Sequence, residues 1–257
     1  LSAFEGCLNL IDIVIPEGVT KIGEKAFKDN VRLYTVIFEG ESKLVSIGDL
    51  AFSNCSSLER IELPASLEKI NGSAFFGANE LEAITVRNTN KFFKSVDGVL
   101  FNIDADTLVA YPAGKYGEYT IPDTVKSIGV YAFALSKFKE IELSGIESIG
   151  AAAFAYSRLE NVDIPDSVTS MGNKAFYSCY NLKSATIGAG LSEISEASFA
   201  STALTEINIP SGIVEIGESA FAGSPLRSVT FAQDSKLITI GRKSFKCTGL
   251  TSVNIPR

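Results

Sequence analysis

The stretch CLNLIDIVIPEGVTKIGEKAF, from Cys7 to Phe27, decides the fold, because the chain goes on to repeat it. Written as a pattern it is C-x-x-L-x-x-I-x-I-P-x-x-V-x-x-I-G-x-x-A-F. Close variants begin at Cys55 (CSSLERIELPASLEKINGSAF) and at Cys179 (CYNLKSATIGAGLSEISEASF). A repeat of nearly constant length fixes the architecture of a chain before its other features are considered. The repetition indicates a stack of similar units, but it identifies no ligand.

The phenylalanine that closes each A-F segment gives the number of units. It recurs at intervals of 21 to 25 residues, apart from one gap of 58 residues between Phe75 and Phe133. We interpret SVDGVLF, which ends at Phe101, as a degenerate copy inside that gap, and this brings the count to eleven units of about 23 residues. The other ten anchors are Phe4, Phe27, Phe52, Phe75, Phe133, Phe154, Phe176, Phe199, Phe221 and Phe245.

Each unit contains two short extended pieces and a turn. In LERIELP, Ile61 and Leu63 alternate around Glu62 as in a half-buried strand, and Pro64 ends the strand because it lacks an N–H group. A second extended piece, V-x-x-I, is followed in most copies by glycine, which predicts a turn with positive φ. The x-x-A-F piece is too short for a stable helix, so we predict one helical or 3-10 turn that directs the phenylalanine inward.

A unit of this length cannot bury an apolar face alone, whereas stacked units share one continuous core. We therefore predict a mainly β solenoid that forms a single domain over residues 1–257. Because Leu1 falls in the middle of a repeat, we expect the sequence to be part of a longer chain.

The amino-acid composition excludes several classes of function. The chain has no histidine, which excludes the histidine-dependent nucleophilic triads and removes the commonest transition-metal ligand. Its net charge of −7 disfavours nucleic acid as a partner, and no apolar run is long enough to span a membrane. We expect no catalytic residues, no cofactor and no resident metal, and therefore no enzyme.

The four cysteines are predicted to be small buried fillers rather than redox or metal residues. They occur close behind a repeat phenylalanine, at a position that other copies fill with small residues. Two copies of the repeat separate Cys7 from Cys55, which is too far for a disulfide. The cysteines are Cys7, Cys55, Cys179 and Cys247.

The pattern L-x-x-L-x-L, combined with I-P, I-G and A-F-x-x-C, resembles the BspA-like (Treponema-type) leucine-rich repeats of bacterial surface and secreted proteins. The resemblance covers nearly the whole chain and implies a leucine-rich-repeat solenoid. It also implies that residues 95–118, within SVDGVLFNIDADTLVAYPAGKYGEYTIP, form a hairpin-like insertion. For function it implies a secreted or cell-surface location, and adhesion to extracellular protein such as host matrix or another cell's surface.

In leucine-rich repeats the first strand of each unit lines the concave face, and its outward residues form the expected binding surface. Here these positions contain seven carboxylates and one arginine, with hydroxyls and amides making up most of the rest, which suits a basic or neutral polar protein. The alternative is that they are merely solvated strand residues. The candidates are Arg60, Glu62, Glu118, Glu140, Glu142, Asn161, Asp163, Glu206 and Asn208.

Tyrosines near the A-F turns form a second candidate surface. Surface tyrosines are typical contact anchors, although core filling explains any one of them equally well. The residues are Tyr131, Tyr156, Tyr177 and Tyr180.

Two kinds of chemistry are disfavoured. Glu140 and Glu142 form a carboxylate pair, but an open sheet lacks the cleft that glycosidase chemistry needs. In NIDADT, the residues Asn102, Asp104 and Asp106 alternate as calcium ligands can, but the glycine and closing glutamate of an EF-hand loop are missing. Such residues are also common turn formers.

Two classes of function remain after these exclusions. The first is a non-catalytic protein-binding or adhesion module that uses the concave strand face. The second is a structural spacer or stalk that presents another domain. A carbohydrate-binding module is a weaker variant of the first, because the predicted stripe contains no aromatic residue. Exposed repeat edges at both ends would also allow weak self-association.

Overall fold

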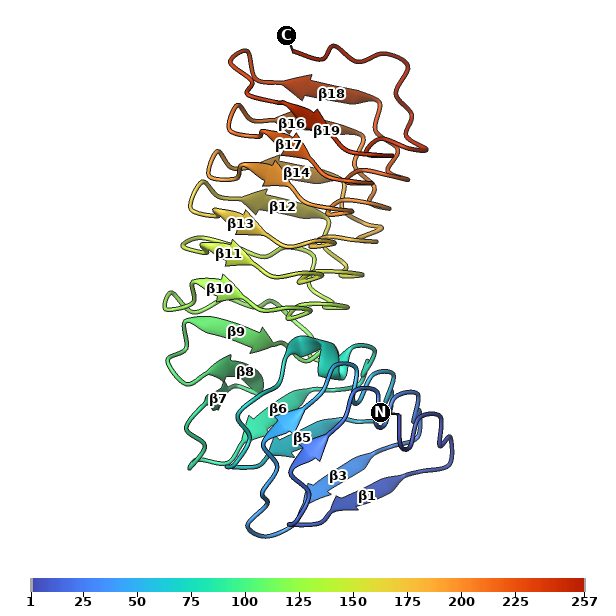
Figure 1. Ribbon diagram of the computed structural model, residues 1–257, viewed down its shortest axis with the longest axis vertical. Helices are drawn as coiled ribbons and strands as arrows, with labels where there is room; N and C mark the ends of the chain where they lie inside the picture. The colour runs from blue at the N-terminus through green and yellow to red at the C-terminus, as the bar shows by residue number, and fades with distance from the viewer. Residues whose placement is uncertain (1, 257) are drawn as a thin grey trace. The chain divides into compact units, whose positions relative to one another are not determined.

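The computed structural model describes residues 2–256 and consists almost entirely of short strands and turns (Figure 1). It divides into two compact units, which are described separately below. Unit 1 comprises Leu1–Tyr116 and Gly129–Ser136, and unit 2 comprises Gly117–Ile128 and Lys137–Arg257. Whether residues 1–257 act as a single domain stays a prediction.

Unit 1 contains nine strands and one 3-10 helix among its described residues. These are β1 (Asp12–Ile15), β2 (Lys21–Ile22), β3 (Thr35–Phe38), β4 (Ser46–Ile47), β5 (Arg60–Leu63), η1 (Gly72–Phe75), β6 (Ala83–Val86), β7 (Phe93–Val96), β8 (Val99–Asn102) and β9 (Thr107–Ala110). Unit 2 contains β10 (Ser127–Ile128), β11 (Ser148–Ile149), β12 (Asn161–Ile164), β13 (Ser170–Met171), β14 (Ser184–Ile187), β15 (Glu193–Ile194), β16 (Glu206–Ile209), β17 (Glu215–Ile216), β18 (Ser228–Phe231) and β19 (Thr239–Ile240).

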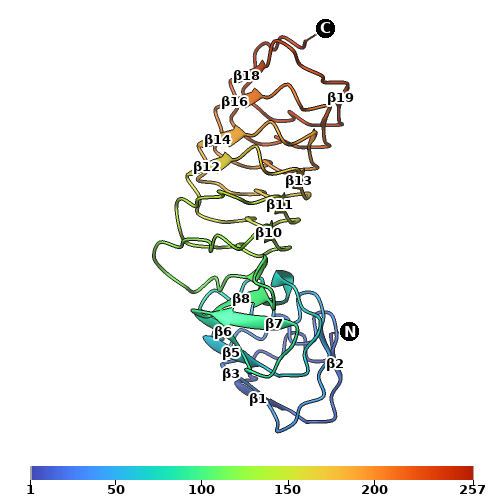
Figure 2. The same ribbon diagram turned by 90° about the vertical axis from the view of Figure 1, so that its left-hand side faces the viewer.

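The four-residue strands pair in parallel from one coil to the next, as in β1 with β3, β5 with β6, β12 with β14 and β16 with β18. Their residues alternate between exposed and buried, which matches the period of two expected for a strand with one face on a core. We call the outer surface of these strands the first-strand face. The two-residue strands form the opposite side, where β10, β11 and β13 pair in parallel and β15, β17 and β19 do the same (Figure 2).

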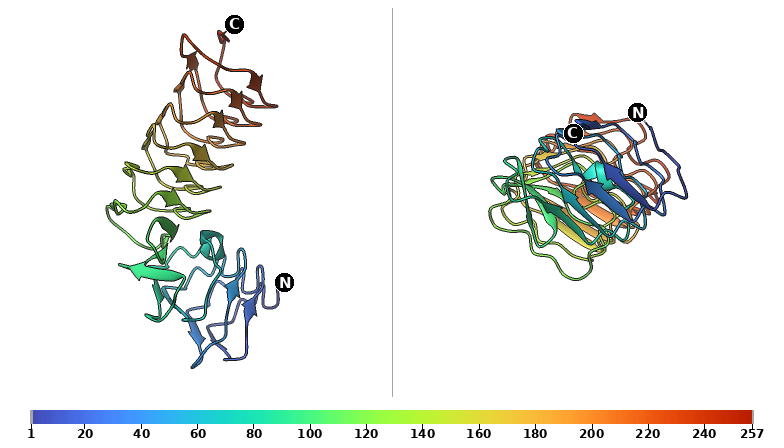
Figure 3. Two further views of the ribbon diagram at one scale, coloured as in Figure 1. Left: turned by 60° about the vertical axis from the view of Figure 1, so that its left-hand side comes forward. Right: turned by 90° about the horizontal axis from the view of Figure 1, so that it is seen from below.

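The A-F turns form the third side of each coil. Alternate backbone N–H groups of a turn donate to carbonyl groups of the next coil, as from Lys174 to Glu196, from Phe176 to Ser198 and from Ser178 to Ala200 (2.8 Å each). All of these bonds point in the same direction along the chain, towards the following coil. Figure 3 shows the resulting stack of coils within unit 2.

The predicted phenylalanine ladder is confirmed within each unit. In unit 1, Phe4, Phe27, Phe52 and Phe75 stack with ring centroids 5.2, 5.4 and 6.1 Å apart. In unit 2, successive centroids are 5.1, 5.3, 5.5 and 5.4 Å apart along Phe154, Phe176, Phe199, Phe221 and Phe245. The rings are parallel to within 10°. Most are fully buried, so the ladder is the shared core that a single unit could not build.

The glycine after V-x-x-I has a different role from the one predicted. None of the seven glycines at this position has a positive φ; the left-handed residue lies two positions later, as at Lys174 (φ 62°). Glycine is required instead because the coils approach closely. A Cβ atom on Gly48 would lie 2.6 Å from the backbone N of Glu24, and one on Gly172 would lie 2.4 Å from that of Ala151.

The A-F turns also differ from the prediction, since η1 is the one 3-10 helix among residues 2–256. Its first N–H groups are capped by Asn71, whose Oδ1 accepts from the backbone N of Ser73 at 2.9 Å. Elsewhere two left-handed residues flank the phenylalanine, such as Lys174 and Ser178 around Phe176. This alternation turns every second N–H group towards the neighbouring coil, which a helical turn would not do.

The predicted hairpin insertion is confirmed, but Phe101 does not close a repeat. Phe101 lies on β8, which pairs antiparallel with β7 and with β9. The three strands form a meander over residues 93–110, so the degenerate copy that we assigned to SVDGVLF is wrong. Ten A-F turns remain, and the mainly β solenoid with one hairpin insertion is confirmed.

The small side chain at the cysteine position donates a hydrogen bond in several coils, although the buried Ala78 fills it in another. The Sγ of Cys55 donates to the Phe27 carbonyl at 3.2 Å, and the Sγ of Cys179 donates to the Phe154 carbonyl at 3.0 Å. Asn30 fills the same position and donates to Phe4. For Cys7 and Cys247 the prediction of burial is wrong, because they lie in the first and last coils and are exposed there.

Candidate functional site

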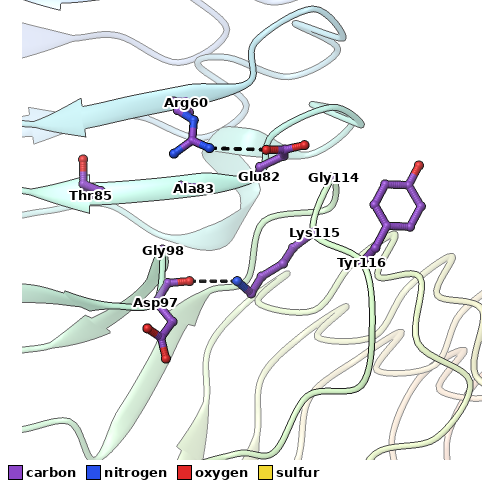
Figure 4. Close-up of a pocket in the computed structure, with 9 residues that line it drawn as sticks. All are labelled: Arg60, Glu82, Ala83, Thr85, Asp97, Gly98, Gly114, Lys115 and Tyr116. Atoms are coloured by element: carbon purple, nitrogen blue, oxygen red, sulfur yellow. Dashed lines mark hydrogen bonds and ion pairs between the residues drawn. The ribbon is translucent and has the colours of Figure 1, made fainter.

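A hollow of about 460 Å³ lies on the first-strand face of unit 1 where the insertion meets the regular strands (Figure 4). We call it the insertion hollow. Three segments build it: β5 with β6, the turn between β7 and β8, and the loop after β9. Its lining residues are Arg60, Glu82, Ala83, Thr85, Asp97, Gly98, Gly114, Lys115 and Tyr116.

Backbone contacts fix the insertion against β6. The N–H of Ile84 donates to the Gly98 carbonyl at 2.8 Å, and the hydroxyl of Ser95 donates to the Ile84 carbonyl at 2.6 Å. Gly98 has φ +78°, and an added Cβ would lie 2.9 Å from the Cβ of Ala83. Only glycine allows this approach, so the turn takes the place that the next regular strand would occupy.

The charges of the insertion hollow are balanced. Arg60 and Glu82 form an ion pair at 3.5 Å, and the Nζ of Lys115 donates to the backbone carbonyl of Asp97 at 2.9 Å. Both dashed contacts are visible in Figure 4. The Arg60 and Glu82 side chains are 73% and 54% exposed, so their pair adds little stability. Two cations and two carboxylates therefore surround a hollow with no net charge.

Unit 2 has a larger hollow of about 840 Å³, also on its first-strand face. It lies beside β12, where residues 117–120 and 137–142 run without regular strand structure. Four carboxylates line it, and we call it the acidic hollow. They are Glu118, Glu140, Glu142 and Asp163.

Polar neighbours hold three of these carboxylates. The amide of Asn161 donates to Glu140 at 3.3 Å, and the hydroxyl of Ser144 donates to Glu142 at 2.7 Å. Asp163 accepts from the hydroxyl of Thr186. None of these donors is charged, so they orient the carboxylates without neutralising them.

Two lysines, Lys137 and Lys139, also line the acidic hollow, and Lys139 pairs with a carboxylate outside it. The Nζ of Lys139 lies 2.8 Å from the carboxylate of Glu160, which is not among the lining residues. The hydrogen bond to Glu160 raises the pKa of Lys139, and the hydrogen bond from Lys139 lowers the pKa of Glu160. Lys183 lies 3.6 Å from the same carboxylate. Four carboxylates against two lysines leave the acidic hollow with an excess of negative charge.

The remaining strand candidates are spread out. Glu62 pairs with Arg87 at 3.4 Å, and Arg87 also donates to the carbonyls of Phe38 and Gly40 at 2.9 and 2.6 Å. Glu62 thus helps to fix a clamp across two coils. Glu206 and Asn208 lie exposed on β16, in a third hollow of about 400 Å³ that contains many hydroxyl groups. The structure therefore brings Glu118, Glu140, Glu142, Asn161 and Asp163 together and leaves the other strand candidates apart.

The tyrosines fall into separate groups. Tyr131 belongs to unit 1, where its ring packs edge-on against Phe76 at 5.4 Å. In unit 2, Tyr156 and Tyr177 are in edge contact at 5.6 Å, and Tyr180 is 66% exposed. Tyr131 is thus at least partly a packing residue, as the alternative reading expected.

Sequence reasoning missed Tyr116, Lys115 and Asp97. The strand pattern could not find them, because they lie in the turn and loop of the insertion rather than on a first strand. The available signal was the insertion itself, since a departure from a regular repeat must leave its surface uneven.

The structure offers little to a metal ion. Asn102 donates to Asp106 at 2.7 Å, and the hydroxyl of Thr107 donates to the same carboxylate at 2.9 Å, so these side chains bond one another within the turn. Within residues 2–256 there is no group of three or more metal-ligating side chains. Over the same residues, no helix has the length and apolar character needed to cross a membrane.

Solved structures of bacterial repeat proteins resemble this chain over nearly all of its length. A leucine-rich repeat protein from Eubacterium ventriosum is 26% identical with a TM-score of 0.82, over 98% of this chain and 80% of that one. The pneumococcal vaccine antigen PcpA is 26% identical (TM-score 0.65), and a leucine rich cell surface protein from Faecalibacterium prausnitzii is 28% identical (TM-score 0.64). Each of these two matches 94% of this chain, which spans only 58% and 62% of their respective lengths.

Comparison with curated proteins finds no match. Among protein families, the "BspA type Leucine rich repeat region" matches in six copies over residues 1–97, 111–227 and 181–257. These ranges cover almost the whole chain and include the coils on both sides of the insertion. The chain belongs to the BspA-type leucine-rich repeat family.

Proposed function

We propose that this chain is a non-catalytic module of the bacterial cell surface that binds a basic segment of an extracellular protein in the acidic hollow. The single observation that carries the proposal is the convergence of Glu118, Glu140, Glu142 and Asp163 on one hollow. The surface location is supported by two similar proteins, a pneumococcal vaccine antigen and a leucine rich cell surface protein.

The chemistry of the acidic hollow favours lysine and arginine side chains as the groups that are bound. Carboxylates gathered on one surface attract cations, and the fork of an arginine can bond two carboxylate oxygens at once. Lys139 does not compete for this role, because its ammonium group is engaged by Glu160. Such complementarity speeds association and fixes the orientation of a partner, and it weakens as salt is added.

The shape of the acidic hollow favours protein over a small metabolite. It is broad and open, and it continues onto the exposed residues of β12, so a partner can contact several coils at once. Binding energy can then come from many moderate contacts over a standard-sized interface. An open site of exposed carboxylates also offers no enclosure for catalysis, which agrees with the repeat family.

The test is a screen followed by a charge reversal. Displayed fragments of extracellular proteins are selected on the full chain, and the Kd of each selected fragment is measured at two salt concentrations. We expect the selected fragments to share lysine- or arginine-rich segments. The double variant Glu140→Lys, Glu142→Lys should raise their Kd by at least about tenfold, which corresponds to about 1.4 kcal/mol.

The matched control is Glu193→Lys, Glu215→Lys. It changes the net charge by the same amount within unit 2, but on exposed residues of β15 and β17 on the opposite side. We expect a change in Kd of less than about threefold. Equal losses in both double variants, or selected fragments without basic segments, would refute the proposal. A screen that selects nothing would favour the structural spacer.

A further inference from the structure

We propose that the insertion hollow of unit 1 is a binding site for a neutral saccharide. The inference goes beyond the proposed function, because it assigns a different class of ligand to a site that is built in unit 1 from other residues. It rests on an exposed aromatic ring, on balanced charge and on the rigidity of the loop that carries the ring.

The aromatic ring is that of Tyr116, whose side chain lies on one side of the insertion hollow (Figure 4). It is 69% exposed, the most exposed tyrosine in the chain. The face of an aromatic ring carries partial negative charge and packs well against the C–H groups of a sugar ring. Sequence analysis disfavoured saccharides because the predicted stripe lacked such a ring, and the insertion supplies one.

The loop that presents Tyr116 is held at several points. The N–H of Gly114 donates to the Leu81 carbonyl at 2.7 Å, and the N–H of Lys115 donates to the Pro112 carbonyl at 3.1 Å. The side chain of Lys115 is tied to Asp97 across the hollow. A ring on a fixed loop loses little conformational entropy when a ligand stacks on it, which favours binding from a shallow surface.

The polar groups of the hollow suit a neutral ligand rich in hydroxyl groups. Arg60 and Lys115 balance Glu82 and Asp97, so neither a polyanion nor a polycation finds a complementary field. Carboxylates accept from sugar hydroxyls, and the guanidinium donates to them. The hydroxyl of Thr85 donates to the Ile61 carbonyl at 3.3 Å, and its oxygen can accept from a sugar hydroxyl. Apart from the tyrosine ring, Ala83 is the one apolar side chain of the lining, which is too little for a lipid.

The size of the hollow agrees with a short saccharide. Small-molecule sites commonly enclose about 300–1,000 Å³, and this hollow has about 460 Å³. Its open side allows a longer chain to pass through, so the end of an oligosaccharide or an internal sugar could be bound. We expect a Kd on the order of 0.1–1 mM for one short chain, as is reasonable for few contacts in a shallow site.

The experiment uses the full chain and a panel of neutral hexasaccharides: maltohexaose, cellohexaose, laminarihexaose, mannohexaose and xylohexaose. A heparin hexasaccharide serves as the charged comparison. Saturation-transfer-difference NMR detects binding, and titration gives the Kd. We expect at least one neutral hexasaccharide to bind and the heparin hexasaccharide to bind at least tenfold more weakly.

Three variants locate the site. Tyr116→Ala should raise the Kd at least tenfold, whereas Tyr116→Phe, which keeps the ring, should stay within threefold of the wild type. Tyr180→Ala removes a similarly exposed ring in unit 2 and should change nothing. The thermal midpoint of each variant, followed by circular dichroism, shows whether the fold is kept.

Several outcomes would overturn the inference: no binding by any neutral hexasaccharide, tighter binding of heparin, or equal binding by Tyr116→Ala and the wild type. Failure here is distinguishable from failure of the proposed function. The double variant Glu140→Lys, Glu142→Lys should leave saccharide binding intact, and Tyr116→Ala should leave the binding of basic fragments intact.

Discussion

Truncating Phe176 to alanine tests the shared core of unit 2 most directly. Its ring is fully buried, and its centroid lies 5.1 Å from that of Phe154 and 5.3 Å from that of Phe199. Removing it eliminates the burial of one aromatic side chain and leaves a cavity between two neighbours that are held in their own coils.

The expected decrease in the free energy of unfolding has two contributions. Transfer of a buried phenylalanine side chain from water contributes about 2–3 kcal/mol. A cavity of about 80 Å³, at roughly 24 cal/mol per Å³, adds about 2 kcal/mol if the neighbours do not collapse into it. The neighbouring rings cannot close the gap without breaking the backbone bonds of Phe176 and Ser178 to the next coil, so we expect nearly the full sum of about 4–5 kcal/mol.

The measurement is urea unfolding followed by circular dichroism, with Phe245→Ala as the control. Phe245 is half-buried and has Phe221 as its ring neighbour at 5.4 Å. Its truncation should therefore cost only about 1–2 kcal/mol. Because repeat arrays can unfold in parts, the transitions of the two units are fitted separately if they resolve. Equal losses in both variants, or a loss below about 1.5 kcal/mol for Phe176→Ala, would refute a core shared between coils.

Three further predictions follow from the turns and the cysteines. Gly172→Ala should lower the free energy of unfolding by about 1–3 kcal/mol in the same assay, because the new Cβ would lie 2.4 Å from the backbone N of Ala151. Lys174 has a left-handed backbone (φ 62°), which glycine adopts easily and a β-branched residue does not. Lys174→Gly should therefore leave the free energy of unfolding unchanged or raise it by up to about 1 kcal/mol, whereas Lys174→Val should lower it by at least about 1 kcal/mol. Burial raises the pKa of the Cys55 thiol to about 12 and that of the Cys179 thiol to about 11. A thiol reagent at pH 8 should therefore modify two thiols of the native protein and all four thiols of the denatured protein. The reactive pair in the native chain is Cys7 and Cys247.

Much of the fold was predictable because each coil packs against a coil of similar sequence. The positions of Ile61, Leu63 and the A-F phenylalanine are apolar in every coil because they face the shared core. Their period therefore predicted the strands, the stack of coils and the phenylalanine ladder. The glycine position was located correctly but explained wrongly. One sequence cannot distinguish a glycine that needs a positive φ from one, such as Gly172, that makes room for a neighbouring coil.

The candidate sites were less predictable because they depend on departures from the repeat. Alternation along the strands identified Glu140, Glu142 and Asp163 as outward-facing, and the structure places them around one hollow. The alternation could not show that Lys139 pairs with Glu160. The partner that a side chain finds in another coil depends on its rotamer, which the repeat period does not determine. The insertion hollow was not predicted either, because the path of the Asp97 turn and of the Tyr116 loop has no counterpart in other coils.

The hydrogen bonds between A-F turns all run in one direction, and this polarity determines how coils can be added to the solenoid. The A-F turns other than η1 offer donors on the C-terminal side and acceptors on the N-terminal side, so a coil of this kind that is duplicated or lost leaves matching surfaces at the new junction. Genes that encode such chains can therefore change length by whole repeats with little penalty. The A-F turns of two chains that meet end to end can continue this series only head to tail, because the opposite encounter sets their donors against donors.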